Sequence, residues 1–562
     1  MYPTETVEPL QWKTIEPLFT ALLKEDLTAH LIPSWLNRWS DLEKIIWEAR
    51  AHLKRDRSYD ENNSAAQHAF QRFVEEIFSP YQLMNQALKT KLLAVPNYVP
   101  APEHLQILRF LRVEANLFRQ ENIPLQAEID ALSSEYGRKA WGLFVHIGDE
   151  TIPLPQAEEH VAGQGRNMRE QAWRLTWTRW HEERAIFDQL FLNLLHKRRQ
   201  LAHNADLPDY RAYRWREMSR LDYTPADCLS LHNAIEAEII PLTAILREQR
   251  RQSLGLTSMR PWDKELSAQF DTTARPFADV RDFESRLIQV YHHLDPELGA
   301  LFERMRHGYL DLGARTGKLH GGEEWLFSAT GLPCIRAYTV GSYEDVGLVL
   351  HESGHAFHDA LSQARQGLFW NIGSPSEFSE FAAIAMTYLA TPYLEQKYGG
   401  FYTPEIAPQV YRKALEDVVV KWLPSIVQVD AFQHWVYTSA PANVTPADLD
   451  AKWLELSMKF EADIDWSGLE QERAMGWQRM SMIFSAPFYQ IEYALAHLGA
   501  LQLWQKAQDD FPATWHTYRE ALLFGNTRSV PELYQAAGVE LPFEREIVKK
   551  VAEFLIGLWL PR

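Results

Sequence analysis

The chain has 562 residues, of which 46% are hydrophobic and 23% charged, the composition of a globular protein that buries a large core. Its net charge of −18 argues against a surface for nucleic-acid phosphates or an anionic membrane, so we expect neither as a partner. Only 26 residues are glycine, and helical periodicity dominates, so we predict a mainly α fold.

Signals for targeting or membrane insertion are not evident in the sequence. The start, MYPTETVEPLQW, lacks a basic stretch followed by an apolar one, so we expect no signal peptide. We expect no transmembrane helix, because no apolar run approaches the roughly 20 residues that a span requires. Two cysteines, Cys228 and Cys334, are too few for a disulfide framework and are expected to be small buried residues. A cytoplasmic location follows as the expectation.

Helices are predicted along most of the chain. Trp173, Trp177 and Trp180 recur at helical spacing, which predicts one buried helix face. A loose division falls near residue 200, so we predict an N-terminal helical region, 1–200, and a catalytic region, 201–562.

One segment interrupts the helical pattern. Residues 323–342 combine β-branched and aromatic residues around a Gly-Leu-Pro turn signal. This pattern predicts a short hairpin, or a pair of strands, directly before the next helix.

That next helix carries the stretch HESGHAFH. Ser342 and Asp345 form a capping-box pattern at its start. His351 and His355 are four residues apart, so both imidazoles project from one face and can reach one metal ion at about 2.0–2.1 Å. Glu352 lies beside them, placed to accept a proton from a water on the metal. The alternative is an ordinary helix face with two hydrogen-bonded histidines.

A zinc site needs a third protein ligand. The metzincin pattern would place a histidine at 361, where this chain has Leu361. Glu377 and Glu380 are better candidates, three residues apart on one face of a helix predicted to start near Ser374. Small and apolar residues follow, and carboxylates in such a buried helix need a partner or a metal. We favour Glu380 as the ligand over Glu377, and expect the other to hydrogen-bond a ligand histidine.

These motifs resemble the thimet oligopeptidase and oligoendopeptidase F family of zinc metallopeptidases, and the bacterial oligoendopeptidase branch in particular. The family pattern HExGHxxH followed by E-x-x-E-[VI]-x-S corresponds to HESGHAFH and EFSEFAAIA, and it assigns the zinc-binding glutamate to Glu380. The resemblance covers residues 165–505 approximately. Further segments resemble the family in the family's order: YRWREMSRLDYTPADC (213–228), LGLTSMRPWD (254–263), DLGARTGKLHGG (311–322) and PFYQIEYALAHLGALQLW (487–504).

The resemblance implies a large two-lobed helical body with a deep central channel, one zinc ion per chain and short oligopeptides as substrates. It implies a tyrosine as oxyanion donor, and the chain offers Tyr489 and Tyr493, of which we favour Tyr493. It places Gly321 and Gly322 in a loop beside the bound peptide, where the following extended segment would pair with substrate as an added strand. His358 also matches the family, and a hydrogen-bonding or substrate-contact role competes there with a core histidine.

The chain departs from the family pattern at three places. Glu323 and Glu324 replace the usual Tyr-Cys, Met482 replaces a histidine that stabilises charge in the transition state, and Thr387 replaces a glutamate. None is a predicted ligand or base. Met482 removes a possible donor, and the two glutamates would bias the cleft against acidic substrates or towards basic ones.

These observations predict a zinc-dependent endopeptidase, a gluzincin-type oligopeptidase that hydrolyses internal bonds of short peptides through a metal-activated water. Two alternatives stay open. One is a metallocarboxypeptidase of similar helical fold, which would release single C-terminal residues. The other is a zinc-retaining peptide-binding protein without turnover, suggested by Met482, although the intact Glu352 favours an enzyme.

Overall fold

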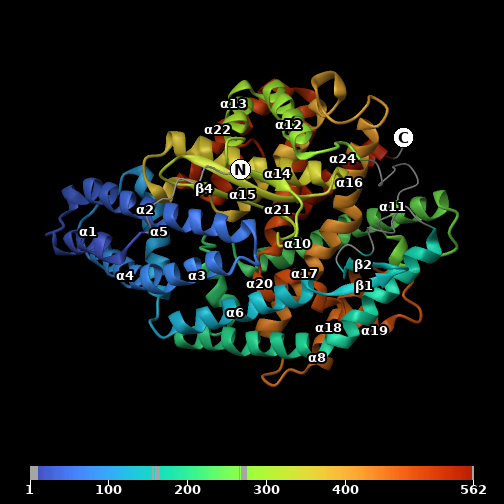
Figure 1. The fold of residues 1–562 in the computed structure, drawn as a ribbon, viewed down its shortest axis with the longest axis horizontal. Helices are drawn as coiled ribbons and strands as arrows, with labels where there is room; N and C mark the ends of the chain where they lie inside the picture. The colour runs from blue at the N-terminus through green and yellow to red at the C-terminus, as the bar shows by residue number, and fades with distance from the viewer. Residues whose placement is uncertain (1–9, 155–156, 158–164, 265, 267–274, 560–562) are drawn as a thin grey trace. The chain divides into compact units, whose positions relative to one another are not determined.

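The computed structural model describes residues 10–154, 157, 165–264, 266 and 275–559. Helices make up most of these residues and the strands are short (Figure 1), so the predicted mainly α class is confirmed. The chain divides into two compact units, each assembled from three separate segments. Unit 1 comprises Met1–Asn116, Arg275–Pro408 and Gly499–Leu541, and unit 2 comprises Leu117–Ala274, Gln409–Leu498 and Pro542–Arg562.

The predicted division at residue 200 differs from these units. Residue 200 lies inside α8 (Arg166–Asn204), a 39-residue helix of unit 2. The helix continues past this point because its apolar face does, with Leu201 and Ala202 both buried. Trp173, Trp177 and Trp180 are all buried on that face, as their spacing predicts.

Unit 1 contains the HESGHAFH motif, within a set of helices and one small sheet. Its helices and strands are α1 (Trp12–Lys24), α2 (Ile32–Tyr59), α3 (Ser64–Phe73), α4 (Ser79–Leu93), α5 (Pro102–Leu117, ending just past the unit), α12 (Val280–Leu294), α13 (Pro296–Met305), β3 (Leu310–Gly313), β4 (Gly322–Phe327), β5 (Leu332–Thr339), α14 (Tyr343–Arg365), α15 (Ser376–Leu389), α22 (Phe511–Leu522) and α23 (Val530–Ala536).

Unit 2 is almost entirely helical in its described part. Its elements are α6 (Asn122–Trp141), β1 (Phe144–Ile147), β2 (Glu150–Pro153), α8, α9 (Tyr210–Glu217), α10 (Pro225–Glu238), α11 (Ile240–Ser253), α16 (Ala407–Asp417, starting just before the unit's second segment), α17 (Leu423–Thr438), α18 (Pro446–Phe460), α19 (Glu470–Ala474), α20 (Ser481–Ser485) and α24 (Arg545–Trp559). Helix α21 (Gln490–Asp509) begins in unit 2 and ends in unit 1.

One helical segment of the described residues is long and apolar enough to cross a membrane by length and composition alone. It is Pro225–Ser253, which comprises α10 and α11. Of its most apolar window, 44% is buried inside the structure, and core helices of soluble proteins pass the same test, so the segment is weak evidence for a span.

The sheet of unit 1 has the order β3-β5-β4. Strands β4 and β5 pair antiparallel, from Gly322 opposite Ala337 to Phe327 opposite Leu332, which confirms the predicted hairpin. Strand β3 pairs parallel with β5 and was not predicted, because four residues give too short a pattern. Trp325 and Phe327 pack with Ala51 of α2, whereas Gly322 lies against α14. The alternation of β4 thus directs its even-numbered residues toward the motif helix.

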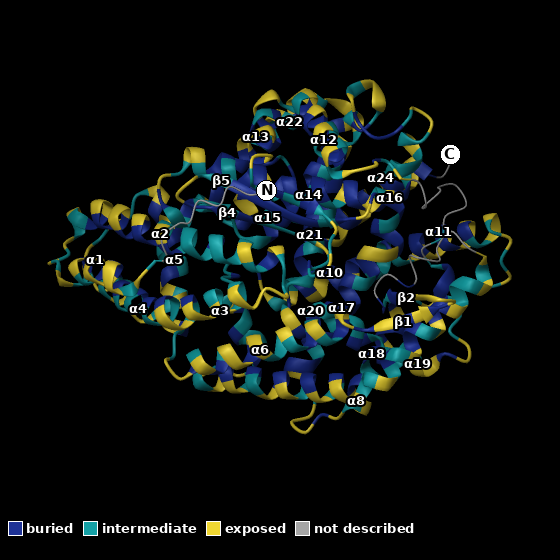
Figure 2. Cartoon of the chain, viewed as in Figure 1, coloured by how far each residue is buried: buried dark blue, intermediate teal, exposed yellow. Residues whose placement is uncertain are grey.

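Helices α14 and α15 lie side by side and are largely buried (Figures 1 and 2). The predicted capping box of α14 is confirmed: Ser342 accepts from the backbone of Asp345, whose Oδ2 accepts from the backbone N–H of Val340, Gly341 and Ser342 at 2.8 Å each. The predicted start of α15 at Ser374 is wrong. The helix begins at Ser376 after the extended Pro375, and the Ser374 hydroxyl donates to the Pro375 carbonyl instead of capping the helix.

Candidate metal centre and active site

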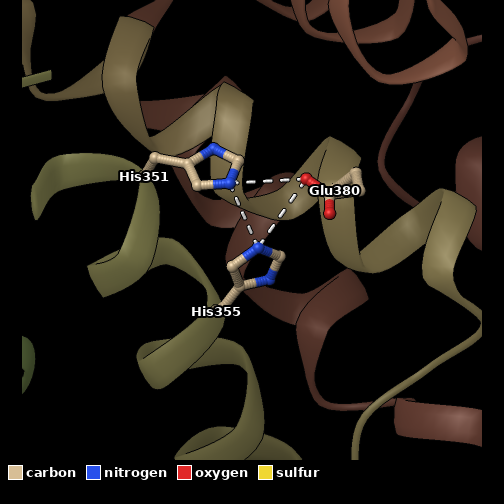
Figure 3. Close-up of side chains that lie close together, drawn as sticks. All are labelled: His351, His355 and Glu380. Atoms are coloured by element: carbon tan, nitrogen blue, oxygen red, sulfur yellow. Dashed lines mark hydrogen bonds and ion pairs between the residues drawn. The ribbon is translucent and has the colours of Figure 1, made fainter. Parts of the chain in front are cut away.

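Three side chains from α14 and α15 converge on one point (Figure 3). The Nε2 atoms of His351 and His355 are 3.3 Å apart, and Glu380 Oε2 lies 3.4 Å from the first and 3.7 Å from the second. An ion held tetrahedrally at about 2.0–2.1 Å from each ligand atom would separate those atoms by about 3.3–3.4 Å. Two imidazole nitrogens and one carboxylate oxygen at this spacing therefore fit a zinc ion with one position left open.

The protonation of both histidines suits metal binding. Burial lowers the pKa of His351 to about 4 and that of His355 well below its ordinary value. Neutral imidazoles are the form that binds a metal. His355 Nδ1 lies 2.9 Å from the Ser379 hydroxyl. In the tautomer that leaves Nε2 free as a ligand, Nδ1–H donates to that oxygen and fixes the plane of the ring.

A close helix contact brings Glu380 within reach of the histidines. A Cβ atom on Gly354 would lie 2.5 Å from Cα of Ala383 and 3.0 Å from Cβ of Met386. The glycine in the motif therefore lets the backbones of α14 and α15 approach each other one turn from the ligands. On α15, Ala382 and Ala383 have side chains of a single methyl group, which also permits the close approach.

Glu352 is buried beside the ligands, with 6% of its surface exposed. Burial and the neighbouring carboxylates of Glu380 and Glu323 raise its pKa to about 8. A Cβ atom on Gly322 would lie 2.5 Å from Glu352 Oε1 and 2.8 Å from Cδ1 of Leu348. The Glu352 carboxyl therefore occupies space that a side chain at residue 322 would fill. Gly321 contributes differently, through a φ of +83° that favours glycine.

The two glutamates that depart from the family pattern have different surroundings. Glu323 pairs with Lys54, at 2.6 Å between Oε1 and Nζ. Burial and the carboxylates of Asp359 and Glu352 raise the pKa of Glu324 well above its ordinary value. Its Oε1 atom is buried and has no hydrogen-bond partner among the described residues. The expected bias against acidic substrates or towards basic ones stays a prediction.

Two predicted accessory residues are buried in the same helices. Glu377 has 2% of its surface exposed, and its backbone carbonyl accepts a hydrogen bond from the Tyr534 hydroxyl. His358 is fully buried against the ring of Phe378, and neither ring nitrogen has a hydrogen-bond partner among the described residues. The structure thus shows His358 as a packed, neutral histidine and not in the predicted hydrogen-bonding or substrate-contact role. Burial lowers its pKa to about 4, in agreement.

The candidate oxyanion donors lie in unit 2. Tyr489 directly precedes α21, and Tyr493 lies in its first turns. Their rings meet edge to face with centroids 5.7 Å apart. Both tyrosines are partly exposed, whereas their neighbours Phe488 and Glu492 are fully buried. The pair therefore forms the accessible edge of an otherwise buried helix start.

Sequence reasoning missed Ser379 and the role of Gly354. Ser379 lies between the two candidate glutamates, and only the orientation of α15 shows that it reaches His355. A signal for Gly354 was present, because a glycine inside a buried helix usually marks a close packing contact.

Comparison with known proteins agrees with this geometry. The profile of Peptidase family M3 matches residues 162–553, well over half of the chain. The chain belongs to Peptidase family M3. The resemblance seen in the sequence is confirmed, and as a member of this family the chain is a peptidase with peptides as substrates. None of the curated proteins compared matches its sequence.

Solved structures share the fold of this M3 peptidase. PZ peptidase A, solved with an inhibitor, superposes with a TM-score of 0.90 at 23% identity, covering 98% of this chain and 97% of its own. A protein described as an oligoendopeptidase F gives 0.90 at 23% identity, covering 98% and 96%. Another so described, from Bacillus anthracis, gives 0.86 at 21% identity, covering 100% and 98%. At these identities the likeness shows the fold alone, which is the helical fold of these peptidases.

Proposed function

We propose that this M3 peptidase is a zinc-dependent endopeptidase that hydrolyses internal bonds of short peptides. The observation that carries the proposal is the convergence of His351, His355 and Glu380 at zinc-ligand spacing, with Glu352 adjacent. Zinc bound there would supply Lewis acidity, which polarises the scissile carbonyl and lowers the pKa of water. The two histidines and Glu380 hold the ion and leave one side open to substrate.

Glu352 acts as the general base and then the general acid. Its carboxylate takes a proton from the attacking water and delivers it to the nitrogen of the leaving amine. Its position fits this role, because the carboxyl is buried and comes from the same helix as both predicted histidine ligands. Gly322 keeps the carboxyl in place by leaving room for Oε1.

Other residues orient the substrate and stabilise the negative charge of the tetrahedral intermediate. Tyr493, with Tyr489 beside it, donates a hydrogen bond to the oxyanion of the tetrahedral intermediate. Strand β4, which follows Gly321 and Gly322, is at the edge of its sheet and offers backbone groups to an extended peptide. A deep channel that admits short peptides, and a cytoplasmic location, belong to the same proposal.

The experiment is mass spectrometry of a mixed peptide pool after incubation with the wild-type protein and with Glu352→Gln, together with zinc analysis of both proteins. We expect internal cleavage by the wild type, a loss of at least about 100-fold in the variant, and equal zinc content. Glu43→Gln is the matched control, since it changes a buried glutamate of unit 1 that bonds Trp39 and Tyr81 and has no predicted part in the site.

Other outcomes would replace the proposal. Release of single C-terminal residues would identify a metallocarboxypeptidase. Zinc retention and peptide binding without cleavage would identify a binding protein, in which Met482 stands where a charge-stabilising histidine is usual. Equal activity of the wild type and Glu352→Gln would remove Glu352 from the mechanism.

A further inference from the structure

The turn before α21 has an unusual backbone. Phe488 has a φ of +65°, in the left-handed region that bulky side chains rarely adopt, and its side chain is fully buried. It is one of four described non-glycine residues with positive φ. The strained residue directly precedes Tyr489. A conformation of this kind persists only where the surroundings impose it.

The surroundings hold both the ring and the backbone of Phe488. Its ring packs edge to face against His434 and Trp215, with centroids 5.3 and 5.9 Å away. Its N–H donates to Gln433 Oε1 at 2.9 Å, and its carbonyl accepts from Arg220 Nη2 at 2.6 Å. Contacts from α9, from the loop that follows it and from α17 therefore hold this single residue.

Arg220 joins the turn to the helix that follows. The same Nη2 atom that donates to the Phe488 carbonyl also donates to Glu492 Oε1 at 2.7 Å. Both side chains of this ion pair have no exposed surface. The guanidinium carbon lies over the Trp215 ring, 4.6 Å from its centroid, which adds a cation–π contact. Glu492 lies between the two candidate oxyanion donors in sequence and next to Tyr493.

We propose that Arg220 is a positioning residue for the peptidase reaction. By binding the Phe488 carbonyl and Glu492 together, it sets the strained turn and the first turn of α21 in one arrangement, and thereby aims Tyr489 and Tyr493. The inference rests on the proposed function, in which a tyrosine stabilises the oxyanion. Every residue of the clamp (Arg220, Gln433, Phe488 and Glu492) lies in unit 2 and is separate from the predicted metal ligands of unit 1.

Preorganisation explains why such a buried pair matters for rate. A donor stabilises an oxyanion best when it already points to the place where charge develops, and a misplacement of about 1 Å can cost about 100-fold in rate. The direction of tyrosine rings on a partly exposed helix edge depends on the backbone that carries them. The clamp constrains that backbone, because arginine can bridge a carbonyl and a carboxylate with its planar group.

The test compares two double variants. Arg220→Met with Glu492→Met removes the clamp without leaving a lone buried charge. Arg250→Met with Glu416→Met is the matched control, because that pair is also buried in unit 2, at 2.8 Å between Nη2 and Oε2, but contacts a different part of it. Circular dichroism and zinc content show whether each variant is folded and loaded.

We expect the clamp variant to have a kcat at least tenfold lower than the wild type, with KM within about threefold. The control variant should have the kcat and KM of the wild type. Adding Tyr493→Phe to the clamp variant should cost much less than it costs in the wild type, because the clamp acts through that residue. Additive losses would overturn the inference, as would an unchanged kcat.

Hydrogen exchange gives a readout that does not depend on activity. Amides of residues 488–494 should exchange faster in the clamp variant and normally in the control. If these amides exchange faster in the clamp variant but the wild type cleaves no peptide, the proposed function is wrong. The positioning role of Arg220 is then wrong too. If their exchange is unchanged, the clamp itself is refuted. If the double variant does not fold, Gln433→Leu replaces it in the test. This substitution removes the hydrogen bond from the Phe488 N–H to α17 and should lower kcat, by less than the double variant is expected to.

Discussion

The metal-ligand region of unit 1 and the tyrosine region of unit 2 reach their geometry by different routes. In the first, His351 and His355 are placed by helical spacing within one short motif, and Glu380 comes from the next helix along the chain. In the second, Phe488 is held by Arg220 and Gln433, which lie 268 and 55 residues away in sequence.

The metal-ligand region can therefore be specified by a short sequence motif, whereas the tyrosine region depends on contacts that only the complete fold provides. Helical spacing and one close contact between α14 and α15 bring the predicted ligand atoms together, and a bound ion would order them further. A donor for a transient charge has no ion to order it, and must be fixed by surrounding contacts before the reaction begins. Substitutions in the two regions should therefore fail in different ways.

The largest effect is expected from loss of the third ligand. Glu380→Gln should weaken zinc binding by more than about 100-fold, beyond what loss of an outer partner costs, and abolish cleavage with it. A competition titration with a chromophoric chelator measures the affinity. Glu377→Gln should bind zinc within about tenfold of the wild type. A reversed result would make Glu377 the ligand.

The next effect belongs to the tyrosine region and should leave the metal untouched. Tyr493→Phe should lower kcat about 100-fold, the usual cost of one lost oxyanion donor, with zinc content unchanged. Tyr489→Phe should cost less than tenfold. Steady-state kinetics on a single cleaved peptide checks both, and the opposite ranking would assign the donor role to Tyr489.

A smaller effect on zinc binding is expected from disturbing the packing of α14 against α15 in unit 1. Gly354→Ala places a methyl group 2.5 Å from Cα of Ala383, which forces α15 away from α14 and should destabilise the protein by about 1–3 kcal/mol. Zinc affinity should fall by tens of fold, since Glu380 moves with α15. Gly347→Ala on the same helix meets nothing within 4 Å and serves as control. Equal zinc affinity of the two variants would contradict the packing argument.

The smallest effect is expected at the outer partner of a ligand. Ser379→Ala removes the oxygen 2.9 Å from His355 Nδ1 and should weaken zinc binding about tenfold. Ser379→Thr keeps a hydroxyl and should restore most of the affinity. The same chelator titration measures both. A loss equal to that of Glu380→Gln would mean that Ser379 does more than orient the ring.

Short-range patterns predicted the parts of the molecule that short-range contacts create. The capping box at Ser342, the hairpin after Gly322 and the shared face of His351 and His355 all depend on residues within a few positions of each other. Strand β3, the contact of Ser379 and the left-handed Phe488 depend on partners far along the chain. Nothing in the letters around Phe488 indicates positive φ, because the residue types that usually adopt it are glycine and asparagine.

The interleaving of the two units has a consequence for synthesis on the ribosome. Tyr518 donates to the Ala382 carbonyl and Tyr534 to the Glu377 carbonyl, so α15 receives its final partners from the last segment of unit 1. Those partners lie 136 and 157 residues further along the chain than the α15 carbonyls that they bond. Loops of that length close slowly, and their exposed apolar faces invite misassembly in the meantime. A nascent chain of this peptidase therefore completes its metal site late, when most of the polypeptide has been made.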